Sequence, residues 1–314
     1  MKTLCIGEAL IDMICTDKGI PLAGSGHFLL KPGGAPTNVA AAIAALGGDA
    51  ALAAKVGNDA FGQKMVQTMQ DFGVSTQWML RSDQHFTTMA FVSLLENGEH
   101  DFVFNRGADG QLTTAEVEAI DLQDVSIIHF GSATAFLPGP LQSAYVYLLQ
   151  KALRQKIFVS FDPNYRRLLF PDDTASFIHQ SWGFLTACDF FKCSEQEAML
   201  LTGTHTVAAA TTVFAQKTTA VFAITLGKEG TLLGLEGNTQ LIPSIPVHCI
   251  DSTGAGDAFV GALLYQLANK AIDGPITATH WQHMVTNANK AGARTCEYLG
   301  AMEAFKYLSG EIVG

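Results

Sequence analysis

The sequence has 314 residues, of which 48% are hydrophobic and only 15% are charged. This composition excludes an intrinsically disordered chain, which needs low hydrophobicity and high charge, and the length suffices for one large or two ordinary domains. The 29 acidic residues outnumber the 19 basic ones, and the net charge of −10 argues against nucleic acid or an anionic membrane surface as a partner.

The sequence predicts a cytoplasmic protein. No apolar stretch approaches the roughly 20 residues of a membrane-spanning helix. Glu8 and Asp12 interrupt the apolar run near the N-terminus, which argues against a secretory signal. The cysteines show neither zinc-binding nor disulfide-framework spacing, so we expect all six to be reduced thiols in the core.

Short β-branched runs alternate with longer runs of helical periodicity. Alternation of this kind predicts βαβ units, and therefore an α/β fold with a mainly parallel central sheet and helices on both faces. The low charge agrees, because buried parallel strands are apolar throughout. We expect strands at 3–6, 50–56, 126–130, 157–161, 190–192 and 221–225, and helices at 36–45, 59–72, 140–154, 195–201 and 206–216.

Two stretches do not fit this alternation. Residues 17–32 are rich in glycine and proline, and β-like runs at 87–95 and 100–105 are joined by Glu96-Asn97-Gly98-Glu99. Asn-Gly between two strands is a strong hairpin signal. We expect both stretches to form a small lid, with segments at about 13–32 and 86–110, on a single domain that spans residues 1–314.

The stretch Asp251-Ser252-Thr253-Gly254-Ala255-Gly256-Asp257 predicts an anion site. It follows a strand-like segment at 241–250 and opens an amphipathic helix. Small residues let a ligand approach the backbone, and the free amides and dipole of a helix N-terminus attract anions. Asp257 in the first turn would repel a phosphate, so it is either a general base for a substrate hydroxyl or a complement to the helix dipole.

This stretch resembles the DTGAGD signature of the PfkB, or ribokinase-like, carbohydrate kinases. A second motif, Gly33-Gly34-Ala35-Pro36-Thr37-Asn38, resembles the GGxxxN signature of that family and lies about 220 residues earlier. The resemblance extends from Ile6 to about Ala301. It implies a Rossmann-like α/β fold with a β-strand lid, and the phosphorylation of a sugar by ATP.

The resemblance implies a role for each matching position. Asp257 would be the catalytic base, and the amides of Gly254, Ala255 and Gly256 would form an anion hole for the transferred phosphoryl group. Arg166, in a segment that resembles the family's DxNxR, would bridge the γ-phosphate and the sugar. Sugar binding is expected from Asp12, Gly33, Gly34, Asn38, Asn105 and Arg106.

Cofactor binding is expected from a third group of positions. Lys192, Ser194 and Glu197 match the nucleotide and magnesium segment, in which Glu197 would hold Mg²⁺ through water; without the family, Glu197 would be interpreted as a helix cap. Thr225, Gly227 and Gly230 match the turn that lines ATP. Asn289, or Asn287 if the register slips, would contact adenine, and Asp251 and Thr253 match a possible K⁺ site.

The choice of sugar depends on finer similarity. Gly33-Gly34-Ala35-Pro36 and Ser160-Phe161-Asp162-Pro163-Asn164 are most similar to bacterial fructokinases, which predicts D-fructose as substrate and fructose 6-phosphate as product. Kinases for 2-keto-3-deoxygluconate, aminoimidazole riboside or ribose share most of these motifs and remain alternatives. A sugar-sensing protein without catalytic activity is a more remote alternative. Lid strands of this family often pair between subunits, so a homodimer is expected through the exposed edge of the lid.

Overall fold

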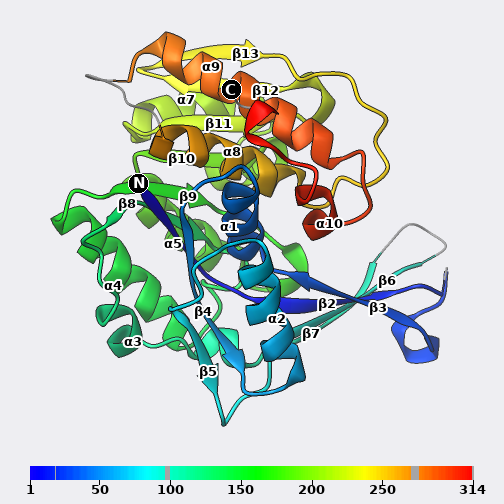
Figure 1. The fold of residues 1–314 in the computed structure, drawn as a ribbon. Helices are drawn as coiled ribbons and strands as arrows, with labels where there is room; N and C mark the ends of the chain where they lie inside the picture. The colour runs from blue at the N-terminus through cyan, green and yellow to red at the C-terminus, as the bar shows by residue number, and fades with distance from the viewer. Residues whose placement is uncertain (18, 96–99, 270–275, 313–314) are drawn as a thin grey trace.

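A nine-stranded sheet runs through the computed structural model, which describes residues 1–17, 19–95, 100–269 and 276–312 (Figure 1). Seven neighbouring strands are parallel, and two antiparallel strands complete one edge. In spatial order the strands are β13 (Asn238–Ile242), β12 (Thr231–Leu235), β11 (Val221–Thr225), β10 (Phe190–Ser194), β9 (Phe158–Asp162), β8 (Val125–Gly131), β1 (Lys2–Ile6), β4 (Ala50–Gly57) and β5 (Met79–Ser82).

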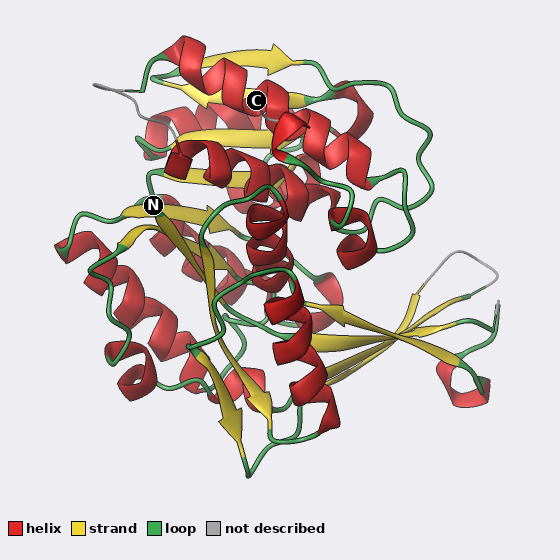
Figure 2. Ribbon diagram, viewed as in Figure 1, coloured by secondary structure: helices red, strands yellow, loops and turns green. Residues whose placement is uncertain are grey.

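Helices cover both faces of this sheet, and each layer encloses its own apolar core (Figure 2). One layer contains α1 (Ala35–Ala45), α2 (Ala60–Asp71), α8 (Ala255–Asn269), α9 (Ala278–Thr295) and α10 (Ala301–Phe305). The other contains α3 (Thr114–Glu118), α4 (Pro140–Arg154), α5 (Thr174–Leu185), α6 (Glu195–Thr202) and α7 (Val207–Lys217). Short 3₁₀ turns lie at Leu22–Gly24, Ala108–Gln111, Arg167–Leu169, Gly227–Glu229 and Gly310–Ile312.

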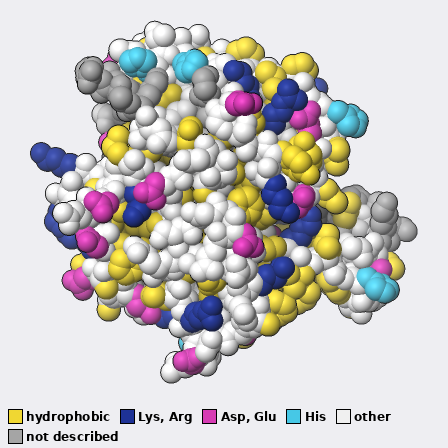
Figure 3. Space-filling view, viewed as in Figure 1, with side chains coloured by type: hydrophobic (Ala, Val, Ile, Leu, Met, Phe, Trp, Pro, Cys, Tyr) yellow, Lys and Arg dark blue, Asp and Glu magenta, His cyan; other side chains and the backbone are white. Residues whose placement is uncertain are grey.

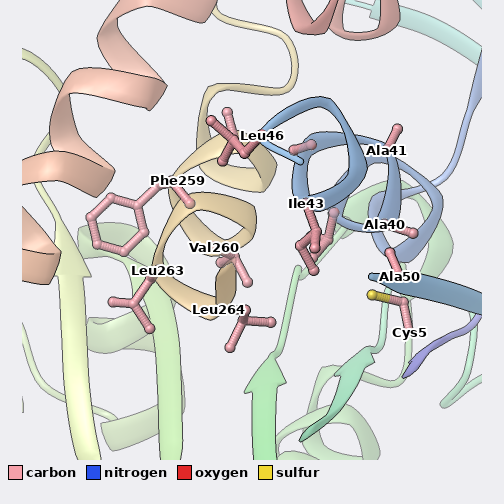
Figure 4. Close-up of a cluster of buried hydrophobic side chains, with 14 of the residues drawn as sticks. Cys5, Ala40, Ala41, Ile43, Leu46, Ala50, Phe259, Val260, Leu263 and Leu264 are labelled. Atoms are coloured by element: carbon pink, nitrogen blue, oxygen red, sulfur yellow. The ribbon is translucent and has the colours of Figure 1, made fainter. Parts of the chain in front are cut away.

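Helices α1 and α8 approach each other closely. Ile43 of α1 and Val260 and Leu264 of α8 belong to one buried cluster (Figure 4). Gly261 of α8 permits the approach, because a Cβ atom there would lie 2.6 Å from the Cβ of Ala42. This packing brings the first turns of the two helices together.

A second sheet of four strands projects from one side of the body (Figures 1 and 2). Strand β2 pairs with antiparallel β3 and parallel β6, and β7 pairs with antiparallel β6. This arrangement confirms the small β-strand unit of the expected fold. Its predicted Asn97-Gly98 turn lies outside the described residues. The strands are β3 (Phe28–Gly33), β2 (Leu10–Cys15), β6 (Met89–Leu94) and β7 (His100–Asn105).

Most of the elements predicted for the body are confirmed, with ends that differ by one or two residues. The strand predicted at 241–250 is wrong, because β13 ends at Ile242 and residues 243–250 form no regular element. Pro243 and Pro246 explain the difference, since proline has no amide hydrogen to donate to a strand partner. The stretch read as irregular at 17–32 contributes β3 at its end.

The cysteines differ partly from expectation. All six are free, and Cys5, Cys188 and Cys193 are buried as predicted. Cys15 and Cys296 are only half-buried, and Cys249 is exposed. The prediction of a core position is therefore wrong for Cys249, which lies in the irregular segment that precedes α8.

Charged side chains are dispersed over the surface. On the face seen in Figure 3, lysine and arginine are interspersed with aspartate and glutamate. Among the described residues, no single helix is long and apolar enough to span a membrane; only α6 and α7 taken together, with a bend of 59° between them, meet that test.

Candidate active site

Two polar side chains meet where α1 and α8 begin. The Nδ2 of Asn38 donates a hydrogen bond of 2.8 Å to the Oδ2 of Asp257. Both residues lie in first turns, which the packing of α1 on α8 holds side by side. The Oδ1 of Asn38 is buried without a hydrogen-bond partner. Because a buried acceptor normally has a partner, this oxygen is suited to receive a ligand hydroxyl.

The loop that leads into α8 is held by Asp251. Its Oδ1 accepts hydrogen bonds from the amide and the hydroxyl of Thr253, at 2.9 and 2.7 Å. Its Oδ2 accepts one from the amide of Gly300 at 2.8 Å. Gly254 has φ +82°, and a Cβ atom there would lie 2.4 Å from the Cβ of Ala301. We call residues 251–256 the anion-hole loop.

A cavity of about 890 Å³ opens at this point. From the anion-hole loop and α8 it is lined by Thr253, Gly254, Gly256 and Asp257, all of them predicted site residues. Ala255 is not among its lining residues, and its amide donates to the carbonyl of Ser252 at 3.2 Å. The part predicted for Ala255 in the anion hole therefore stays a prediction.

A buried cation lines the cavity beside the start of α8. Lys192 is buried and pairs with Asp162, with 3.1 Å between Nζ and Oδ2. Burial lowers the pKa of Lys192, but the carboxylates of Asp162, Glu197 and Asp257 outweigh it and raise the pKa above its ordinary value. A Cβ atom on Gly256 would lie 2.9 Å from the Lys192 Nζ, so this permanent charge faces the start of α8.

Glu197 combines two roles in the structure. Its Oε2 accepts from the amide and hydroxyl of Ser194, at 2.7 and 2.8 Å, in a capping box that starts α6. Its Oε1 accepts from the amide of Tyr165 at 2.7 Å, which positions the segment that carries Arg166. The capping interpretation is therefore correct. Ser194 and Glu197 also line the cavity, and their predicted part in cofactor binding stays a prediction.

Three carboxyl groups line the cavity with raised pKa values. Burial raises the pKa of Asp257 to about 6; Asp162 adds to this, whereas the Asn38 amide, Lys192 and Arg166 oppose it. Burial likewise raises the pKa of Asp12 to about 6, against Arg166. It raises that of Glu8 to about 8. A carboxyl group with a pKa near 6 is ionised at neutral pH and can still accept a proton.

The raised pKa of Asp257 in the free protein predicts an acid limb in kcat/KM. Because a general base must be ionised, kcat/KM for the sugar is expected to reach half its plateau near pH 6 and to fall about tenfold per pH unit below it. Initial rates from pH 4.5 to 8.5 at sugar concentrations well below KM measure this. A kcat/KM unchanged between pH 7 and pH 5 would contradict the assignment of Asp257.

Asp12 and Gly34, both predicted to bind the sugar, line the cavity, and Asp12 lies on β2 of the four-stranded sheet. Gly33 acts indirectly: a Cβ atom there would lie 2.1 Å from the Oδ2 of Asp12, so glycine leaves room for that carboxylate. Gly34 has φ +109°, and a Cβ atom there would lie 2.3 Å from the carbonyl oxygen of Glu8. Neither position has space for a side chain.

The structure does not bring Asn105 and Arg106 to the cavity. Asn105 is exposed at the end of β7. Arg106 donates to the carbonyls of Pro138 and Thr134, at 2.7 and 3.0 Å, and its Nε lies 3.8 Å from Asp109. These contacts connect the end of β7 to the body, so the geometry favours a positioning role for Arg106 over the predicted contact with sugar.

The residues predicted for the rest of the nucleotide lie beyond this cavity. Thr225 is the last residue of β11, which pairs in parallel with β10. The carboxyl end of β11 therefore lies at the same edge of the sheet as the carboxyl end of β10, which carries Lys192. Gly227 and Gly230 have φ +59° and +110° in the turn that follows. The Asn289 amide is hydrogen-bonded within the protein, to the Thr231 hydroxyl at 2.6 Å and the Ile242 carbonyl at 2.9 Å.

The geometry does not distinguish between Asn287 and Asn289 as the residue that contacts adenine. Asn287 is buried and donates to the Oε1 of Gln266 at 3.0 Å. Since both asparagine amides have partners inside the protein, the contact with adenine stays a prediction for either residue.

Several residues that line the cavity were not predicted, and three of them bear on its chemistry or its walls. Glu8 lies two residues after the end of β1, and an acid at the carboxyl end of a buried parallel strand is a usable signal for a site. Phe102 and Phe104 of β7 have stacked rings with centroids 6.2 Å apart. Only the pairing of β7 in the small sheet reveals that these two rings face the cavity.

Comparison with known proteins agrees with this geometry. Residues 1–306 match the pfkB family of carbohydrate kinases. The chain belongs to this family. It is 34% identical to fructokinase-1 of Oryza sativa subsp. japonica over 304 residues, which cover 94% of this chain and 92% of the relative.

Solved structures of pfkB-type kinases have the same fold. A double mutant of fructokinase from Vibrio cholerae O395, in the fructose, ADP and potassium ion bound form, is 30% identical with a TM-score of 0.84, and the match covers 99% of this chain and 96% of that one. A putative ribokinase II from E. coli in complex with ATP and Mg²⁺ is 25% identical with a TM-score of 0.84, over 99% and 97%. The ribokinase-like fold is therefore confirmed.

Proposed function

We propose that this pfkB kinase transfers the γ-phosphate of ATP to the 6-hydroxyl of D-fructose, with Asp257 as general base. The observation that carries the proposal is the position of Asp257, held by Asn38 in the first turn of α8 at the edge of a cavity. The similarity to fructokinases over nearly the whole chain favours fructose. Kinases for 2-keto-3-deoxygluconate, aminoimidazole riboside or ribose are the alternatives that the experiment below distinguishes.

The sugar would bind between the two helix starts and the small sheet. Asp12 accepts hydrogen bonds from sugar hydroxyls, and the Oδ1 of Asn38 gains the partner that it lacks. Asp257 takes the proton of the reacting hydroxyl, whose oxygen attacks the γ-phosphorus while the bond to the β-phosphate oxygen breaks. Amides of the anion-hole loop and the charge of Lys192 stabilise the phosphoryl group as it transfers.

A magnesium ion fits the carboxylates available here. Among the described residues no group of three or more metal-ligating side chains occurs, and Mg²⁺ in kinases needs only one or two carboxylates beside phosphate oxygens and water. Glu197 would hold its water ligands. The ion would neutralise charge on the phosphates. Asp251 and Thr253 would contribute to a K⁺ site, although their side chains are hydrogen-bonded to each other.

The charge of Arg166 is expected to act on the transferred phosphate. Arg166 lies exposed at the mouth of the cavity, and its charge lowers the pKa of Asp12 and of Asp257. Arg166→Ala should reduce kcat/KM about tenfold or more, since guanidinium pairs bidentately with phosphate. The matched control is Arg167→Ala, which removes an exposed arginine that also lines the cavity. A loss below about twofold for Arg166→Ala would place it away from the phosphate.

The four-stranded sheet would act as a lid over the sugar and as a dimer contact. It supplies Asp12, Phe102 and Phe104 to the cavity, and exposes Leu29 and Val103. Exposed strand edges with apolar side chains favour pairing with a second copy. We further propose a cytoplasmic enzyme whose partners are a sugar and ATP, with no part for nucleic acid or membrane.

An assay of ADP release tests the choice of substrate. Fructose, ribose, aminoimidazole riboside, 2-keto-3-deoxygluconate and glucose are compared with ATP and Mg²⁺, with and without K⁺. We expect the highest kcat/KM for fructose. A higher value for another of these sugars replaces fructose in the proposal, and no turnover on any of them contradicts a sugar kinase. A rate that is the same with and without K⁺ removes the cation site at Asp251 and Thr253.

A further inference from the structure

Two cysteines lie side by side behind the anion-hole loop. Cys249 precedes Asp251 by two residues, and Cys296 caps the C-terminal end of α9. The amides of Ile250 and Asp251 donate to the carbonyl oxygen of Cys296, at 2.8 and 3.2 Å. Cys249 is the direct neighbour of Ile250, so these bonds hold its segment against Cys296. A disulfide needs two Cα atoms about 4.4–6.8 Å apart. The Cys249 side chain also makes a hydrogen-bonding contact with that of Cys296.

The two thiols differ in access to solvent. Cys249 is exposed, and Cys296 is half-buried with its Sγ 3.4 Å from the carbonyl oxygen of Gly292. Burial raises the pKa of the Cys296 thiol to about 11, and Cys249, Asp251 and Glu297 add to this. An exposed thiol meets a soluble oxidant first, so Cys249 is the attacking group and Cys296 the resolving one.

We propose that Cys249 and Cys296 form a dithiol that low-molecular-weight disulfides oxidise to an intramolecular disulfide, which changes the anion-hole loop and lowers turnover. The Cys249 thiolate attacks one sulfur of the small disulfide and releases one thiol. The Cys296 thiolate then attacks the Cys249 Sγ and releases the second. Two protein thiols are oxidised, and one small disulfide is reduced to two thiols.

The contacts of Asp251 connect this pair to the site. An S–S bond of about 2.05 Å with its narrow range of dihedral angles joins the two segments covalently and fixes their relative position. Asp251 follows the Cys249 segment and is bonded to Thr253 and Gly300. Gly254 packs against Ala301 without spare room. A covalent link between Cys249 and Cys296 therefore acts on the segments that hold both sides of the anion-hole loop.

Peptide mapping under non-reducing conditions tests the pair. The full-length protein is incubated with oxidised glutathione and digested, and the expected product links the peptides that contain Cys249 and Cys296. Cys249→Ser should abolish this link, and Cys296→Ser should leave glutathione on Cys249. The matched control is Cys15→Ser, which alters another half-buried thiol and should keep the link. Unreacted Cys249 and Cys296, or glutathione on Cys249 without a link, would overturn the proposal.

Turnover measured on the same samples tests the consequence. In the unaltered protein we expect kcat to fall at least threefold on oxidation and to recover with dithiothreitol. In Cys249→Ser the same oxidation should leave kcat unchanged. A complete link with unaltered kcat would overturn the effect on the loop. Peptide mapping requires no enzyme activity, so its result is independent of whether fructose is the substrate.

Discussion

Replacing Asp257 by asparagine is expected to lower kcat by about 10³-fold, within the range that general bases contribute. Asparagine keeps the size of the side chain and an oxygen that can accept the hydrogen bond from Asn38, but it cannot take a proton from a hydroxyl. The affinities for sugar and for ATP should change by less than about threefold. Steady-state kinetics give kcat, and calorimetric titration gives the two affinities.

The matched control addresses the alternative that Asp257 only complements the dipole of α8. Glu303 is an acid in the first turn of α10, paired on the surface with Lys306 at 2.6 Å. Glu303→Gln removes an acid from a helix start without touching the cavity, and kcat should stay within about twofold. If Asp257→Asn keeps more than a tenth of the activity, Asp257 complements the dipole and is not the base.

Gly254→Ala should reduce kcat by about 10²-fold, comparable to the loss of a donor from an oxyanion hole. A side chain at φ +82° is strained, and its Cβ atom would meet Ala301 at 2.4 Å, so the anion-hole loop must move. Affinity for the sugar should remain near normal, because the sugar residues Asp12 and Asn38 lie on other elements. Kinetics and sugar titration together separate these two effects.

Gly47→Ala is the control for backbone strain alone. Gly47 has φ +89° after the end of α1, and nothing lies within 4 Å of the Cβ position. This variant should lose about 1 kcal/mol of stability, as expected for a non-glycine residue in the left-handed region, with kcat unchanged. Equal losses of kcat in Gly254→Ala and Gly47→Ala would show that strain, and not the anion-hole loop, causes the effect.

The sequence predicted elements well where one local signal determined the structure. Strand β11 and helix α4 have the predicted bounds, because their apolar patterns are clear and Pro140 marks the start of α4. The error at 241–250 arose because β-branched and apolar residues outweighed Pro243 and Pro246 in the prediction. Strands β2 and β3 depend on pairing between segments that no local pattern reveals.

The sequence motifs predicted those parts of the candidate site in which the backbone conformation determines the residue type. Gly34 and Gly254 could be recognised because their conformation and close contacts demand glycine. Arg106 was misplaced toward the sugar because its side-chain direction follows from contacts with Thr134 and Pro138, which are distant in sequence. Glu8 was overlooked because its approach to the cavity depends on how the chain passes from β1 of the large sheet to β2 of the small one.

Phosphorus NMR of the reaction products tests whether the protein phosphorylates fructose at the 6-hydroxyl and whether Asp257 is the base. Fructose, ATP and Mg²⁺ are incubated with the unaltered protein and with Asp257→Asn, and the position of the new phosphate ester is read from its coupling to the sugar protons. The expected result is ADP and fructose phosphorylated at the 6-hydroxyl, formed only slowly by the variant. No ester of fructose, an ester at another hydroxyl, or equal rates for the two proteins would contradict the proposed reaction and its base.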